Sequence, residues 1–205
     1  ISAGNPVLGY ATNNALLPKV LFMVILAPVI EEYIFRKQLI DRMHIYGEKL
    51  AVFTSALMFG LFHGNLSQFF YAFALGLVFG YVYLKTGKLR YSIGLHMLIN
   101  FIGSVVGPFF LEKLAVLDTM ETMDMAALEP ILPWLLGFGA YVLVLIGLAI
   151  AGLVLLCINK RRVSFAPAEL ELPKESRFRT VYLNVGMILL ILGCAALIIS
   201  NVIML

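Results

Sequence analysis

Residues 133–158 read PWLLGFGAYVLVLIGLAIAGLVLLCI, a stretch of 26 residues without one formal charge. A helix needs about 20 apolar residues to cross the hydrocarbon core of a bilayer. Residues 181–205 and 91–111 reach that length without a formal charge as well. Residues 50–84 form a charge-free run of 35, which suits two short spans at about 1.5 Å per residue. Because these runs do not alternate with polar residues, strands are excluded and the sequence predicts helices.

The composition identifies the class of protein. Hydrophobic residues make up 61% of the chain and charged residues 13%, whereas soluble domains carry about 25% charged residues. We therefore expect an all-α, polytopic transmembrane helix bundle forming one integral membrane domain over residues 1–205. We expect catalytic helices within about 15–111 and two accessory spans after them. The six expected spans are 15–38, 50–63, 67–84, 91–111, 133–158 and 180–204.

The first residue is Ile1 rather than Met, and no basic region precedes an apolar core. We therefore expect no signal peptide and interpret the chain as a fragment that lacks upstream helices. The two cysteines, Cys157 and Cys194, fall within expected spans, where they are interpreted as small apolar side chains rather than a disulfide or metal ligands.

Charge in the loops predicts the orientation. Thirteen of the fifteen Lys and Arg residues lie in 36–49, 85–90 and 159–179, and positively charged loops stay in the cytoplasm. The opposite loop, 112–130, holds one lysine and five acidic residues: Glu112, Asp118, Glu121, Asp124 and Glu129. The net charge of +3 is thus a topology signal, with the lipid bilayer as partner and no nucleic acid. Short loops favour a multi-pass protein of the bacterial plasma membrane.

The first expected span ends in an acidic pair, Glu31-Glu32, followed by Arg36. A charge near the bilayer centre costs at least about 2.5–3.5 kcal/mol, so such residues usually serve function. Glu32 and Arg36 are four residues apart on one helix face and are expected to form an ion pair. Glu31 points about 100° away and has no basic neighbour at i+3 or i+4. Its carboxyl must either be neutralised by burial or find a partner on another helix, and a carboxyl in such surroundings suits a general base.

Two further polar groups lie on apolar helices. His63 follows Phe59 by four residues, and His96 precedes Asn100 by four. His96 and Asn100 share a helix face and can both donate to one point, as a developing oxyanion requires. Taken singly, His63 can be a structural hydrogen-bonding residue, and the His96–Asn100 pair can join two helices.

Together the three patterns resemble the motifs of the CAAX-protease and bacteriocin-processing family, also called Abi proteins. They stand here as Glu31-Glu32-x-x-x-Arg36, Phe59-x-x-x-His63 and His96-x-x-x-Asn100, within about residues 17–104. Members usually have about eight spans. The resemblance implies an intramembrane endopeptidase that hydrolyses membrane-associated peptides or proteins. It implies that Glu31 and His63 activate a water, that His96 and Asn100 stabilise the oxyanion, and that Glu32, Arg36 and Phe59 support them.

Alternatives stay open at this point. Glu31, His63 and His96 are the residues that would hold Zn²⁺ with one open position, but the chain has no His-Glu-x-x-His helix motif, and we favour a site without a cofactor. A non-catalytic membrane scaffold or immunity or regulatory protein of the same family is the second function. A small transporter that couples protons through Glu31 is the third.

One spacing is difficult for the peptidase interpretation. Counting along the helices puts His63 at the outer end of the second span and His96 near the inner end of the fourth. The second span must be short or tilted, or the turn at Gly64–Ser67 must re-enter the protein. The small residues Ala72, Gly76 and Gly80 favour close packing of the third span against a neighbour over an oligomer interface.

Overall fold

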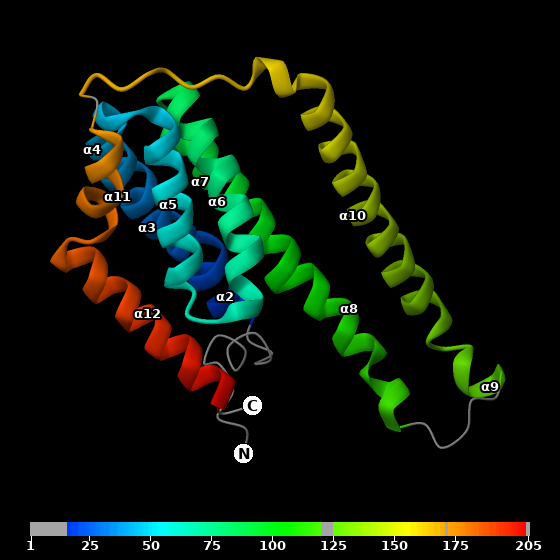
Figure 1. Cartoon of the computed structure of the whole chain (residues 1–205). Coiled ribbons are helices and arrows are strands. Elements are labelled where there is room, and N and C mark those ends of the chain that lie inside the picture. The colour runs from blue at the N-terminus through cyan, green and yellow to red at the C-terminus, as the bar shows by residue number, and fades with distance from the viewer. Residues whose placement is uncertain (1–15, 120–124, 171, 204–205) are drawn as a thin grey trace. The chain divides into compact units, whose positions relative to one another are not determined.

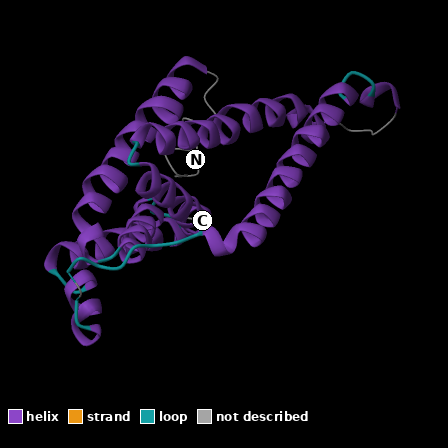
Figure 2. Ribbon diagram, turned by 90° about the horizontal axis from the view of Figure 1, so that it is seen from above, coloured by secondary structure: helices purple, strands orange, loops and turns teal. Residues whose placement is uncertain are grey.

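A computed structural model describes residues 16–119, 125–170 and 172–203. Within these ranges the chain forms helices, turns and loops and no strand (Figure 2). The prediction of an all-α protein is confirmed. Ile1, residues 15 and 204 at the ends of the first and last expected spans, and the acidic residues Glu121 and Asp124 lie outside the described residues.

The first helical rod changes its winding around the acidic pair. It consists of α2 (Leu16–Lys19), η1 (Val20–Leu26), α3 (Ala27–Glu32), η2 (Tyr33–Ile40) and α4 (Asp41–Met43). Segments η1 and η2 are π-helical, a wider winding that is rare and often found at functional sites. Pro28 lies at the start of α3, where its missing N–H leaves one helical hydrogen bond unmade. Glu31 and Glu32 therefore occupy a short α-helical stretch between two π-helical ones.

A tight helical hairpin follows the short helix η3 (His44–Tyr46). Helix α5 (Glu48–Phe62) ends at His63, and Gly64 turns the chain with a φ of +67°. Helix α6 (Leu66–Thr86) begins where the Asn65 side chain accepts a hydrogen bond from the Gln68 amide at 2.7 Å. A Cβ at Gly76 would lie 2.9 Å from the Ala56 Cα of α5. The small residues of α6 thus let the two helices pack closely, as predicted.

The described helices, labelled in Figure 1, belong to two compact units. The first unit holds the described residues up to Asn100 and those from Phe165 onward, and the second holds those of 101–164. The prediction of one integral domain over residues 1–205 stays a prediction. The later helices are α7 (Leu89–Phe101), η4 (Ile102–Val106), α8 (Gly107–Leu114), η5 (Ala115–Thr119), α9 (Met125–Leu128), α10 (Leu132–Asn159), η6 (Lys160–Arg162), α11 (Lys174–Tyr182) and α12 (Val185–Ile203).

The described residues contain three helical stretches long and apolar enough to cross a membrane: Leu66–Thr86, Leu89–Asp118 and Leu132–Arg162. A fourth is reached if Lys174–Tyr182 and Val185–Ser200, bent by 60°, count as one span. Helix α5, at 15 residues, is too short by that measure. The apolar part of the first rod contains three charged residues, Lys19, Glu31 and Glu32, and the rod is not among these apolar stretches. The chain is a multi-pass membrane protein, and the count of six spans stays a prediction.

Parts of the three basic loops meet at one end of the first unit. The Lys85 Nζ lies 2.6 Å from the Glu48 Oε2, which also accepts a hydrogen bond from the Ala166 amide at 2.7 Å. The Leu170 amide donates to the Ile45 carbonyl at 2.9 Å. Burial alone would raise the pKa of Glu48, but these two donors together bring it below its ordinary value. The loops therefore share one side, as predicted, and its assignment to the cytoplasm stays a prediction.

Candidate active site

The predicted ion pair between Glu32 and Arg36 is present and fully buried. The Arg36 Nε lies 3.0 Å from the Glu32 Oε2, the Nη2 lies 3.2 Å from the Oε1, and both side chains are 0% exposed. The guanidinium carbon lies 4.8 Å from the ring centroid of Phe59 and 5.9 Å from that of Phe79. Two charges withdrawn from water are stable only when paired and hydrogen-bonded, and this two-bond contact with its flanking aromatic faces meets that need.

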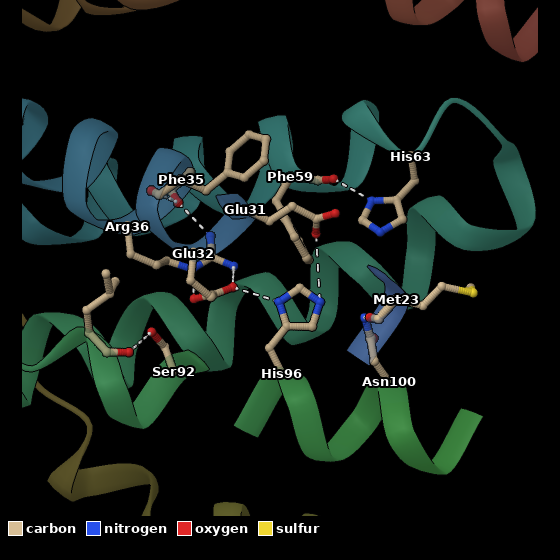
Figure 3. Close-up of polar contacts among 12 residues, drawn as sticks. Met23, Glu31, Glu32, Phe35, Arg36, Phe59, His63, Ser92, His96 and Asn100 are labelled. Carbon is tan, nitrogen blue, oxygen red and sulfur yellow. Dashed lines mark hydrogen bonds and ion pairs between the residues drawn. The ribbon is translucent and has the colours of Figure 1, made fainter. Parts of the chain in front are cut away.

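His96 lies between the two carboxylates of the acidic pair (Figure 3). Its Nδ1 is 3.1 Å from the Glu32 Oε1, and its Nε2 is 3.7 Å from the Glu31 Oε2. Because both Glu32 oxygens accept hydrogen bonds from Arg36, the Oε1 is assigned as the acceptor here too, and the Nδ1 of His96 as the donor. The Nε2 is therefore the nitrogen that His96 presents to Glu31. Phe79 stacks on the imidazole with a centroid distance of 5.3 Å.

Glu31 points away from this ion pair and toward the two histidines. Its side chain is 20% exposed, against 5% for His96, and it extends from α3 toward the rings of His63 and His96 (Figure 3). Two outcomes were predicted for Glu31, neutralisation by burial or a partner on another helix. The structure places a partner, His96 of α7, beside it. The carboxylate is thus held near two imidazoles while part of its surface remains open.

His63 reaches the same place from the end of α5. Its Nδ1 lies 2.8 Å from the Phe59 carbonyl oxygen, which can only accept, so the Nδ1 carries a proton and the neutral ring keeps an unprotonated Nε2. The ring of Phe59 contacts His63 at 4.9 Å and His96 at 5.5 Å between centroids. The two histidines therefore converge on Phe59. Of the geometries considered for bringing the two histidines to one depth, the structure has the short helix: the 15 residues of α5 rise only about 22 Å.

Asn100 is placed beside the site but is engaged elsewhere. Its Nδ2 donates a hydrogen bond of 2.8 Å to the carbonyl oxygen of Met23 in η1, which ties α7 to the first rod. Among the described residues its second amide N–H is left as a donor for an oxyanion, and the Nε2 of His96 can donate only when the ring carries a second proton. The joint oxyanion role of these two residues stays a prediction.

The alternative in which Glu31, His63 and His96 hold Zn²⁺ stays untested. Within residues 16–119, 125–170 and 172–203, no group of three His, Cys, Asp or Glu side chains is placed to hold a metal ion. Glu31, His63 and His96 are neighbours, but they do not meet this requirement together.

Two side chains of the site were missed in the sequence. Ser55 of α5 is fully buried and accepts a hydrogen bond from the Arg36 Nη1 at 2.8 Å. Phe79 of α6 is 2% exposed and covers both Arg36 and His96. The adjacent hydroxyls of Thr54 and Ser55 in an apolar helix were a signal for the first. Nothing in the sequence distinguishes Phe79 from the other phenylalanines.

Comparison with known proteins finds a similarity to CAAX proteases. Residues 13–102 match the family model described as type II CAAX prenyl endopeptidase Rce1-like. The chain is also similar to the membrane-embedded CAAX protease MroQ of Staphylococcus aureus (strain USA300), with 32% identity over 88 residues, or 40% of this chain and 36% of that protein. The match thus spans little more than a third of the length of this curated relative. No solved structure matches the chain.

The matched region contains all three motifs and ends just beyond Asn100. The side chains that these motifs contribute come from α3 and η2, from α5 and the residue after it, and from α7. These segments are far apart in sequence and adjacent at the site (Figure 3). This part of the chain is similar to proteins of the CAAX-protease and bacteriocin-processing family.

Proposed function

We propose that this chain hydrolyses peptide bonds of membrane-associated peptides or proteins, with Glu31 as the general base. The observation that carries the proposal is the position of the Glu31 carboxylate beside the Nε2 of His96 and facing His63, in a site that is mostly buried. A carboxylate and two imidazoles in low-dielectric surroundings are sufficient for acid–base chemistry on a bound water. Glu32 and Arg36 neutralise each other, which leaves Glu31 as the carboxylate of the pair for proton transfer.

The proposed reaction starts with a water held between Glu31 and the Nε2 of His63. Glu31 removes one proton as the water oxygen attacks the carbonyl carbon of the substrate. The oxyanion accepts one hydrogen bond from the remaining amide N–H of Asn100. It accepts a second from the Nε2–H of His96 when that ring has taken up a proton from solvent, which it keeps through the reaction, and Glu32 balances the charge of the imidazolium. Glu31 then returns the proton to the departing amine as the C–N bond breaks. One water is consumed, and the products are a carboxylic acid and an amine.

The substrate class is proposed from the relatives. The matching family model and MroQ both carry the CAAX name, so a prenylated C-terminal peptide is the first substrate to test, with the same peptide lacking its prenyl group as the second. The bacterial source of MroQ accords with a location in a bacterial plasma membrane, as the short loops predict.

The proposal is tested with purified protein in liposomes and a panel of such peptides in water enriched in ¹⁸O. Hydrolysis requires one oxygen atom from water in each new carboxyl group, and mass spectrometry of the N-terminal product reports it. We expect cleavage with incorporation of one ¹⁸O label. A panel that includes both peptide classes and yields no product would contradict the peptidase function.

Retention of activity after metal removal is the second expectation of this assay. We propose that the site works without a bound metal, because its carboxylate and imidazoles are sufficient for water activation and are not arranged as a metal-binding group among the described residues. Incubation with EDTA or 1,10-phenanthroline, followed by gel filtration, should change the cleavage rate less than about twofold. A loss that added Zn²⁺ restores would reject this part of the proposal.

A second candidate function is favoured by one observation. The Nδ1 of His96 and the Nδ2 of Asn100 both have protein acceptors, Glu32 and Met23, as expected of groups that hold helices together. A non-catalytic family member would use the site as a scaffold. A Glu31→Gln protein that restores the phenotype of a deletion strain would favour this candidate.

A further inference from the structure

We propose that Ser55 is a positioning residue of this site, acting through Arg36 and Glu32 to fix the orientation of His96. The inference rests on the proposed function, but its geometry is independent of any motif. Ser55 lies on α5, outside all three family patterns, and its side chain is fully buried.

Ser55 makes two hydrogen bonds that join α5 to the first rod. Its Oγ donates to the carbonyl oxygen of Phe35 at 2.7 Å and accepts from the Arg36 Nη1 at 2.8 Å. Phe35 and Arg36 are neighbours in the π-helical segment η2. The Ser55 hydroxyl is fixed to the backbone at Phe35. It therefore fixes the position of the guanidinium group of Arg36, the next residue.

A series of side-chain contacts leads from Arg36 to Glu31, the candidate base. Arg36 holds both oxygens of Glu32, the Glu32 Oε1 faces the Nδ1 of His96 at 3.1 Å, and the Nε2 of His96 faces Glu31 at 3.7 Å. Directional hydrogen bonds join Arg36 to Glu32 and Glu32 to His96, so each group orients the next as far as the His96 ring. Ser55 is the end of this series that is anchored to the backbone of another helix.

Burial makes the Ser55 contact difficult to replace. The Arg36 side chain is 0% exposed, and its guanidinium lies beside the rings of Phe59 and Phe79, which offer no hydrogen-bond acceptor oxygen. Without the Ser55 hydroxyl, the Nη1 of a buried cation loses its acceptor, and such a group moves to find another. Because Arg36 also holds Glu32, that movement would pull the Glu32 oxygen away from His96.

The test compares Ser55→Ala with a matched control on the same helix. Thr54 is also fully buried, and its hydroxyl lies 2.9 Å from the hydroxyl of Tyr182, on the side of α5 that faces α11. Thr54→Val removes a buried hydroxyl without touching Arg36. We expect Ser55→Ala to lower kcat about 10- to 100-fold with KM changed less than about twofold, and Thr54→Val to leave kcat within about twofold. Equal losses in both variants, or a wild-type kcat for Ser55→Ala, would overturn the proposal.

A spectroscopic readout separates this inference from the peptidase function. The Nδ1–H of His96 should give an imidazole proton signal in a ¹⁵N-histidine NMR spectrum, assigned by its absence in His96→Gln. We expect the signal in the wild type and in Thr54→Val, and its loss or shift in Ser55→Ala. If the wild type cleaves nothing, the proposed function fails while this spectrum still decides the role of Ser55. An unshifted signal in Ser55→Ala would reject the role.

A second variant guards against loss of the fold. Ser55→Cys nearly keeps the side-chain volume but replaces the hydroxyl by a weakly hydrogen-bonding thiol. If Ser55→Ala does not fold, Ser55→Cys is expected to fold, to shift the His96 signal and to lower kcat. A Ser55→Cys protein with wild-type kcat and spectrum would contradict the proposal.

Discussion

Replacing Glu31 by glutamine is expected to abolish peptide-bond hydrolysis, with a rate at least about 10³-fold below that of the wild type. The amide keeps the size of the carboxylate but cannot accept a proton from water at neutral pH. His63 and His96 remain in place, so binding of substrate should change little and the loss should fall on kcat. Initial rates of product formation in liposomes measure the effect, with thermal unfolding as a check that the fold is retained.

The matched control is Glu112→Gln, which removes an exposed carboxylate of α8. It makes the same chemical change far from the three motifs in sequence, and it should leave the rate within about twofold of the wild type. Turnover by the Glu31→Gln protein at the rate of this control would show that another group serves as the base.

Arg36→Leu is expected to lower the free energy of unfolding by about 3–5 kcal/mol, because it leaves the buried Glu32 carboxylate without its countercharge. The leucine also cannot serve Ser55 as a donor. For a membrane protein of this size that loss is a large part of the total stability. Unfolding in mixed micelles with increasing SDS, followed by circular dichroism, measures the change.

Lys37→Leu is the control for the loss of a cation at the neighbouring position. The Lys37 Nζ lies 2.6 Å from the Asp41 Oδ2, but these side chains are 53% and 39% exposed, and exposed pairs contribute about 0–1 kcal/mol. Replacing both buried partners, in Glu32→Gln with Arg36→Leu, should restore part of the lost stability. If Arg36→Leu costs no more than Lys37→Leu, the buried pair does not stabilise the fold.

Helix spacing and composition were sufficient to predict the framework of the site. The pairing of Glu32 with Arg36 follows from their separation of four residues. The lack of a local partner for Glu31 left two outcomes, neutralisation by burial or a partner on another helix. These are properties of one helix, and a sequence displays them directly. The peptidase interpretation required His63 and His96 to converge but supplied no physical reason for it, because tertiary packing decides which distant side chains meet.

The features that the sequence did not predict depend on contacts between helices. The π-helical segments around α3 break the regular spacing that periodicity assumes, and no residue pattern marks their limits. Asn100 was expected to face an oxyanion with His96, yet its amide binds the backbone of Met23, and a backbone carbonyl leaves no trace in the side-chain sequence. Ser55 and Phe79 were missed because their roles depend on contacts with side chains of other helices, Arg36 and His96.

The shortness of α5 has a consequence for how water reaches a protein embedded in lipid. A helix that rises about 22 Å cannot match a hydrocarbon layer of about 30 Å, and its Phe53 and Phe62 side chains are exposed at 45% and 53%. Lipids beside such a helix thin locally, at a cost of fractions of a kcal/mol per ångström. If α5 is one of the predicted spans, with His63 at its outer end, the headgroup layer comes close to His63. The water that the proposed hydrolysis consumes then has only a short distance to travel from bulk solvent.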